Sequence, residues 1–344
     1  YQCLDALTTG LYNTAVGYQA LSTSVDGDGN SAFGYLALTN YEGADTQGNN
    51  SGFGFKAGQF VSTGENNTFI GSYAGVGVSG TELTGSSNTA VGYFAGTTLQ
   101  GSAANNTLLG RSAGTDMTTG DENVAVGSSA CANITTTDYN TTLGANTLST
   151  ATIAVNNTAV GYNSMASVKA GVGVSSCVAL GYGSLIGNSS NTTGIDGTIA
   201  VGYQALASLT TGAGNVAVGY QASTALTTGA YNIAIGYRAL DAADGGEADN
   251  MAIGYHALGD LNSGGAARNM AIGNYAMDGV GTVGSHLDNV FIGHTAGSGT
   301  WTTAVSSYNV GIGNYVMDAA MNGALNNTAV GHATLSELTT GDHN

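Results

Sequence analysis

The sequence contains no proline, and several other residue types are scarce. Its 344 residues include one tryptophan, three cysteines and only five lysines and arginines together. Charged residues make up 8% of the chain, whereas ordinary globular domains carry about 25%. A chain without proline can donate every backbone N–H group to a β-sheet ladder. No apolar run approaches the roughly 20 residues that a spanning helix needs, so we do not expect membrane insertion.

The charges that are present are mostly negative. Twenty-two acidic and five basic side chains give a net charge of −17, and such a surface repels nucleic acid and anionic membranes. Divalent cations and basic partners remain compatible with it. The cysteines Cys3, Cys131 and Cys177 occupy three different places in the repeat described below. We therefore expect free and mostly buried thiols, without a disulfide framework or zinc spacing.

The dominant feature is a repeat typified by Asn13-Thr-Ala-Val-Gly-Tyr-Gln-Ala-Leu21, which recurs along the whole chain. Indexed by its glycine, it occurs 18 times at intervals of 17 to 21 residues, from Gly17 to Gly331. Asparagine stands four residues before this repeat glycine in 16 copies, with Cys177 and Thr198 as the exceptions. A fixed period of this length is typical of a solenoid, which grows by adding turns.

The acidic residues avoid the conserved part of each repeat. None of the 22 lies between the asparagine and the fourth residue after the glycine, and unpaired carboxylates are rarely buried. The pattern predicts that this window is the buried part and that the variable half is a solvated turn. The window alternates and is rich in β-formers, so we expect one strand per repeat, or two if Gln-Ala-Leu also forms a strand.

These strands predict an all-β fold, a parallel β-solenoid of about 18 rungs spanning residues 1–344 as a single continuous array, excerpted from a longer one. Stacked rungs would align the asparagines as an amide ladder along the axis. The expected ladder residues include Asn13, Asn30, Asn50, Asn67, Asn88, Asn123, Asn215, Asn232 and Asn250. So short a coil would leave a face of Tyr and Leu exposed. We therefore expect burial of this face between chains, most simply in a parallel homotrimer.

The repeat resembles the tandem repeats of phage tail-fibre-like proteins and related bacterial surface fibres. Asn123-Val-Ala-Val-Gly127 and Asn232-Ile-Ala-Ile-Gly236 are also similar to the Asn-Ser-Val-Ala-Ile-Gly motif in the heads of trimeric autotransporter adhesins. That resemblance implies left-handed parallel β-rolls, a trimer and an extracellular location on a virion or a cell surface. The rungs here are longer than those of the adhesin heads, and no anchor or chaperone domain is recognisable.

Two places could contact a ligand. Asp26-Gly-Asp28-Gly-Asn30 looks like the start of a calcium loop, but Ala37 stands where the final Glu ligand belongs. A polar turn is the simpler interpretation, with a surface Ca²⁺ site as the alternative. Trp301 lies in a variable turn, where an exposed ring could stack on a sugar. Local packing of a long insertion is the simpler interpretation for this residue, with the sugar contact as the alternative.

Asparagine-linked glycosylation is a third possibility. Asn-x-Ser/Thr sequences are abundant enough here for chance matches, and they occur at Asn49, Asn66, Asn105, Asn133, Asn140, Asn156, Asn188, Asn191 and Asn326.

The sequence therefore favours a non-enzymatic extracellular fibre or shaft without a cofactor or metal, adhesive through repeated polar turns that could meet cell-surface glycans. Two alternatives stay open. One is a filament subunit that stacks end to end, and the other is a polysaccharide-processing enzyme on a β-helix scaffold. No Ser-His-Asp or Cys-His arrangement repeats along the chain, which disfavours the enzyme.

Overall fold

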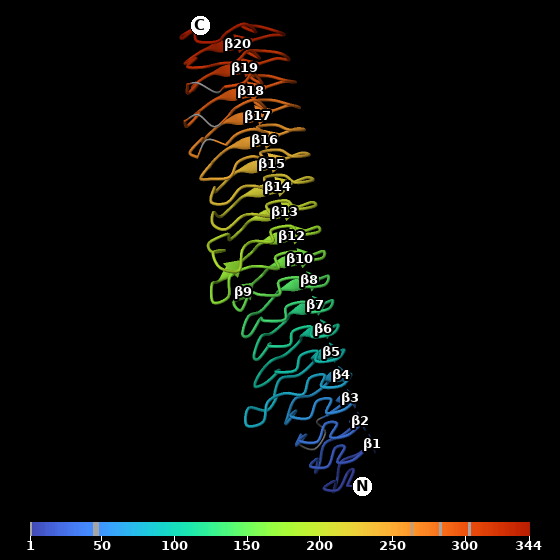
Figure 1. Ribbon diagram of the computed structural model, residues 1–344. Helices are drawn as coiled ribbons and strands as arrows, with labels where there is room; N and C mark the ends of the chain where they lie inside the picture. The colour runs from blue at the N-terminus through green and yellow to red at the C-terminus, as the bar shows by residue number, and fades with distance from the viewer. Residues whose placement is uncertain (1, 44–47, 263, 282–283, 302–303) are drawn as a thin grey trace. The chain divides into compact units, whose positions relative to one another are not determined.

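The computed structural model describes residues 2–43, 48–262, 264–281, 284–301 and 304–344. It divides into two compact units, residues 1–173 and residues 174–344, each of which is a stack of turns (Figure 1). The first unit contains β1 (Thr14–Val16), β2 (Ser31–Phe33), β3 (Ser51–Phe53), β4 (Thr68–Ile70), β5 (Thr89–Val91), β6 (Thr107–Leu109), β7 (Val124–Val126), β8 (Thr141–Leu143), β9 (Ala154–Val155) and β10 (Thr158–Val160). The second contains β11 (Val174–Ser175), β12 (Val178–Leu180), β13 (Ile199–Val201), β14 (Val216–Val218), β15 (Ile233–Ile235), β16 (Met251–Ile253), β17 (Met270–Ile272), β18 (Val290–Ile292), β19 (Val310–Ile312) and β20 (Thr328–Val330).

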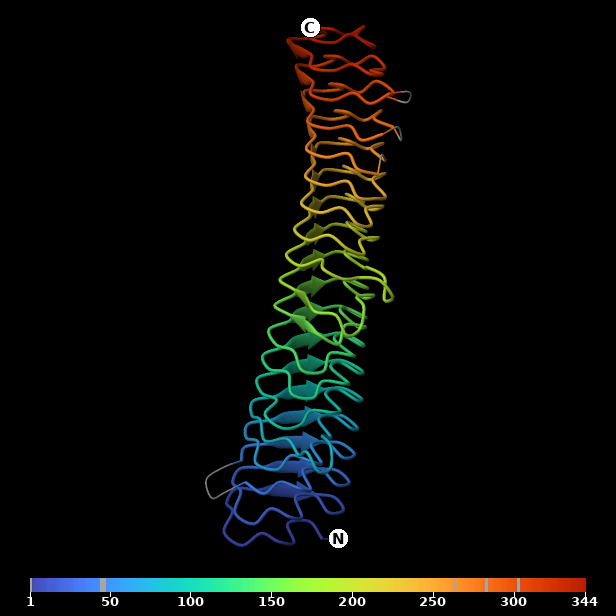
Figure 2. The same cartoon turned by 90° about the vertical axis from the view of Figure 1, so that its left-hand side faces the viewer.

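The predicted parallel β-solenoid is confirmed in both units. Eighteen of the twenty strands, nine in each unit, end on the residue before a repeat glycine. Neighbouring strands pair in parallel without a shift in register, as where Ala217 of β14 lies beside Ala234 of β15. The strand arrows accordingly lie one above another along one face of each stack (Figure 2). No helix occurs among the residues that the structure describes. That the two units form one continuous array stays a prediction.

The repeat glycine is fixed by the rung that follows it. At Gly254, a Cβ atom would lie 2.5 Å from the carbonyl oxygen of Gly273, and φ is +139°. Any larger residue would therefore meet backbone that cannot move aside, in a backbone conformation that other residues rarely adopt. The same close approach to the next repeat glycine occurs at sixteen of the eighteen repeat glycines, which explains why glycine recurs at this position.

Each turn builds its core from two directions. The residue two before the glycine, usually Ala, points inward, and so do the Ala and Leu that follow the glycine by three and four residues; Ala217, Ala205 and Leu206 are completely buried. The variable half adds further buried side chains about seven residues after the glycine, such as Leu209 and Leu226. The variable half is thus only partly the solvated turn that the acid distribution predicted.

Large and small residues compensate each other inside the turns. Phe69 occupies the inward strand position that is usually Ala, and it fills space beside Gly58 and Gly75, which stand where other turns carry Leu. Phe291 relates in the same way to Gly297. A large Phe facing a small Gly therefore replaces the usual small Ala facing a large Leu. The core volume stays about the same, as close packing requires.

The prediction of an exposed Tyr and Leu face is therefore half right. The Leu four residues after the glycine is buried, as at Leu206 and Leu240, whereas Tyr220 and Tyr237 directly after the glycine stay exposed. The expected burial of the whole window also needs correction. Alternation in a strand sends every second side chain outward, so residues such as Ile235 face solvent.

Candidate functional site

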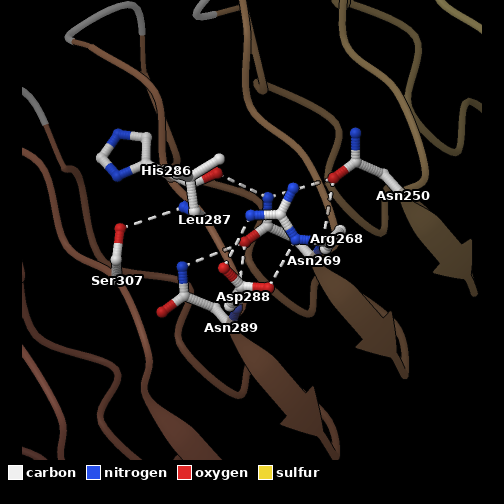
Figure 3. Close-up of polar contacts among 8 residues, drawn as sticks. All are labelled: Asn250, Arg268, Asn269, His286, Leu287, Asp288, Asn289 and Ser307. Atoms are coloured by element: carbon white, nitrogen blue, oxygen red, sulfur yellow. Dashed lines mark hydrogen bonds and ion pairs between the residues drawn. The ribbon is translucent and has the colours of Figure 1, made fainter.

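Asparagine amides run up each unit as a hydrogen-bonded ladder. The backbone N–H and the Nδ2 of Asn269 both donate to Oδ1 of Asn250, at 3.1 and 3.0 Å. Asn289 makes the same pair of bonds to Asn269, at 3.2 and 3.0 Å (Figure 3). Each Nδ2 also donates to a backbone carbonyl, as Asn269 does to His286 at 2.8 Å. Because these amides are buried, satisfying both their ends avoids a large desolvation cost.

The structure places all nine of the asparagines expected in the ladder at its rungs. In the first unit the chain of bonds runs without a break through Asn13, Asn30, Asn50, Asn67, Asn88, Asn106, Asn123, Asn140 and Asn157. In the second unit it runs through Asn215, Asn232, Asn250, Asn269, Asn289, Asn309, Asn327 and Asn344.

The second unit begins with two rungs that lack the asparagine. Cys177 directs its Sγ toward the carbonyl oxygen of Ile195 at 3.2 Å, and a thiol is only a weak donor. Thr198 buries its Oγ1 without a hydrogen-bond partner among the described residues. Neither side chain carries the paired donor and acceptor of an amide, so the ladder is weakest here.

A second set of rung-to-rung bonds uses carboxylates. Two residues before the ladder position, an Asp side chain accepts the backbone N–H of the matching residue one rung earlier. Asp28 accepts from Leu11 at 2.6 Å, and Asp196 accepts from Ser175 at 2.7 Å. Asp121, Asp138 and Asp342 occupy the same place. This role was not predicted, although the fixed spacing of Asp before the ladder position is its signal in the sequence.

These bonds bear directly on the proposed cation turn. Asp26 Oδ1 accepts hydrogen bonds from Thr8 and Thr9, Asp28 serves Leu11, and Asn30 is a ladder residue. Each side chain therefore already has a structural partner. Among the described residues, no group of three or more His, Cys, Asp and Glu side chains could hold a metal ion.

Trp301 is buried, as the local-packing interpretation expected, so its ring is not exposed for stacking on a sugar. Its ring packs edge-on against His286 and Phe291, with ring centroids 5.3 and 5.8 Å apart. The indole therefore lies in the core and does not face solvent. Burial also lowers the pKa of His286, since the charged imidazolium would lose its hydration.

The glycosylation sequences fall into two groups. Asn140 is a buried ladder residue whose Nδ2 donates to Asn123 and to Ala154, so it is not available for modification. The other eight are exposed. Five of them directly precede a ladder position, where φ lies between 57° and 59°: Asn49, Asn66, Asn105, Asn156 and Asn326. Asparagine tolerates this left-handed conformation well, so the backbone alone accounts for its presence there.

The cysteines agree with the expectation of mostly buried thiols. Cys131 and Cys177 are buried, whereas Cys3 is exposed, and none of the three forms a disulfide. Burial raises the pKa of the Cys131 thiol to about 12 and that of Cys177 to about 11. Only Cys3 is therefore placed for thiolate chemistry.

The outward side of the strands carries three parallel columns of side chains. The first outer column lies three residues before the repeat glycine, the second outer column lies one residue before it, and the tyrosine column lies directly after it. In the tyrosine column, Tyr203, Tyr220, Tyr237 and Tyr255 stack face to face with ring centroids 5.1 Å apart. No residue of the second outer column is buried. Apolar side chains thus face solvent along the length of each unit.

Sequence comparisons add no assignment to this geometry. No protein-family model matches the chain, and no characterised protein sequence matches it. In the described residues, no helix is long and apolar enough to cross a membrane.

Proposed function

We propose that this chain is a structural segment of an extracellular fibre that assembles as a parallel homotrimer and has no enzymatic activity. The observation that carries the proposal is the apolar outer face of the strands, which is most complete in the second unit. Val218 and Ile235 in the second outer column and Tyr220 and Tyr237 beside them are all partly or largely exposed. Extended apolar surface of this kind marks a contact with another molecule. The number three and the extracellular location rest on the resemblance to adhesin heads and tail fibres.

The interior supports a mechanical role. Rungs are joined by strand pairing, by the amide ladder and by the Asp bonds to backbone, and all three act along the same axis. Such stacking resists separation of neighbouring turns cooperatively. The variable turns repeat a polar surface many times, which suits weak, summed adhesion to glycans.

Electron microscopy of the purified chain tests this proposal. End-on class averages are expected to show three solenoids side by side in one particle. Averages showing a single isolated solenoid would contradict the assembly and, with it, the fibre role.

A further inference from the structure

The two units differ in the chemistry of their outer face. In the first unit, the first outer column is almost entirely hydroxyl-bearing: Thr14, Ser31, Ser51, Thr68, Thr89, Thr107, Val124, Thr141 and Thr158. In the second unit the same column is almost entirely apolar: Val178, Ile199, Val216, Ile233, Met251, Met270, Val290, Val310 and Thr328. Both runs are in continuous parallel register. Only the second unit therefore has mostly apolar side chains in both the first and the second outer column.

We propose that the outer face of the second unit, formed by its three columns, is the surface on which a second copy of this chain docks, aligned along the same axis. The inference rests on the proposed function and narrows it, because it assigns the contact between copies to residues 174–344. The face of the first unit is then a solvated face.

Charge favours a second copy at this place. With a net charge of −17, two chains repel each other wherever their acidic turns meet. The three columns of the second unit contain no Asp, Glu, Lys or Arg, whereas Arg111 lies in the tyrosine column of the first. Two copies can approach on the uncharged face while their carboxylates stay apart in the turns.

The period of the face also favours a copy. Its side chains repeat once per rung, and stacked tyrosine rings such as Tyr220 and Tyr237 lie 5.1 Å apart. A helix repeats about every 5.4 Å and one face of an extended peptide about every 6.6 Å, so over nine rungs about 4.8 Å apart the side chains of either would drift out of step. A partner with the same rung spacing meets every column at every rung, and a second copy has that spacing.

The area is sufficient only for a partner of matching length. Nine rungs about 4.8 Å apart, each spanning four residue steps of about 3.3 Å from the first outer column to the tyrosine column, give a strip of roughly 43 by 13 Å. Two facing strips together bury about 1,100 Å², which just clears the roughly 1,000 Å² expected of a specific interface. A short peptide would cover too few rungs.

Matched substitutions test the assignment. Val218→Glu puts a carboxylate on the face of the second unit, and Val91→Glu puts one at the equivalent position of β5 in the first unit. Both positions face outward, so both variants are expected to keep the wild-type circular dichroism spectrum. In light scattering, Val218→Glu is expected to have the mass of one chain, and Val91→Glu the mass of the wild-type assembly.

The outcomes separate this inference from the proposed function. A multi-chain wild type whose mass survives Val218→Glu, or falls equally with Val91→Glu, overturns the inference and leaves the fibre proposal standing. A wild type of single-chain mass overturns both. If Val218→Glu loses its spectrum, Val218→Thr and Val91→Thr decide. The protein concentration at which the assembly dissociates is expected to be at least tenfold higher for Val218→Thr than for Val91→Thr. Equal concentrations for the two variants would overturn the inference.

Discussion

Oδ1 of Asn232 accepts two hydrogen bonds from Asn250, one from its backbone N–H at 3.0 Å and one from its Nδ2 at 3.2 Å. Asn232→Ala removes both and also the bond from its own Nδ2 to Glu247. Buried donors left without an acceptor cost roughly 1–3 kcal/mol, so the thermal midpoint should fall clearly. Asn191→Ala, at an exposed turn position, is the control. Equal midpoints for the two variants would show that the ladder does not stabilise the fold.

Restoring the missing rungs should have the opposite effect. Thr198→Asn gives an amide to a site where a hydroxyl is buried without a partner among the described residues, next to Asn215 on the following rung. Each ladder bond gained is expected to add about 1 kcal/mol. Thermal unfolding of the Cys177→Asn and Thr198→Asn variants, singly and combined, measures this gain in stability. The double variant should have the highest midpoint. A lower midpoint for Thr198→Asn would mean that the site has no room for an amide.

The repeat glycine should tolerate no side chain. Gly254→Ala places Cβ 2.5 Å from the carbonyl oxygen of Gly273 at a φ of +139°. Strain and displaced backbone together predict a loss of roughly 3 kcal/mol or more. Gly246→Ala is the matched control in the same unit, since its Cβ would meet only Thr228 Oγ1 at 3.9 Å. Denaturant unfolding should separate the two variants widely, and similar midpoints would contradict the close approach of successive rungs.

Asp278 should make the stability depend on pH. Burial, with Asp260 and Asp241 nearby, raises its pKa from 3.8 to about 6, and His256 opposes the shift. The folded state therefore binds the proton more tightly, so this stability is complete below pH 4 and is lost as pH rises through 6. Asp278→Asn should match the wild type at pH 4. At pH 7 it should be more stable, by at most about 3 kcal/mol, since one pKa unit corresponds to about 1.4 kcal/mol.

Asp288 is a control whose pKa shift has the opposite direction to that of Asp278. Arg268 lies 2.7 Å away and lowers the pKa of this carboxyl, so its contribution is present at neutral pH and is lost on acidification. Asp288→Asn should thus be slightly less stable than the wild type at pH 7, with the difference vanishing in acid. A pH-independent difference for either variant would contradict its assigned environment.

Thiol accessibility checks the placement of the three cysteines. Ellman's reagent should titrate one thiol per native chain, that of Cys3, and three after denaturation. Cys131 and Cys177 are buried, with pKa values of about 12 and 11, so little thiolate forms at neutral pH. Cys3→Ser should abolish the native reaction, and rapid labelling that persists in this variant would show that a buried turn opens.

Much of the fold could be predicted because each turn repeats the same constraints. The glycine series located the strands, and the asparagine series located the ladder. The outward direction of Val218 and Ile235 was missed because acid-free sequence alone does not distinguish a core from an uncharged surface. The bends of the chain after the repeat glycine could not be predicted either. Gln204 and Leu206 adopt left-handed conformations there, with φ of 52° and 50°. Neither residue type signals that conformation.

Irregular turns were the hardest part to predict. Trp301 is buried against His286 and Phe291, and composition cannot show that. Glu247 is buried as well, with its two carboxylate oxygens accepting the N–H groups of Gly264 and Gly245. Each of these side-chain arrangements occurs in a single turn, so it does not appear as a repeating pattern in the sequence. The exchange of Phe69 for Ala against Gly75 is likewise visible only once the turns are stacked.

The molar mass of the purified chain in solution, measured by light scattering after size exclusion, tests the central claim most directly. A fibre segment that buries its apolar face between copies is expected to have three times the chain mass of 34.0 kDa, unchanged on dilution into the nanomolar range. A monodisperse particle of 34.0 kDa would contradict the account.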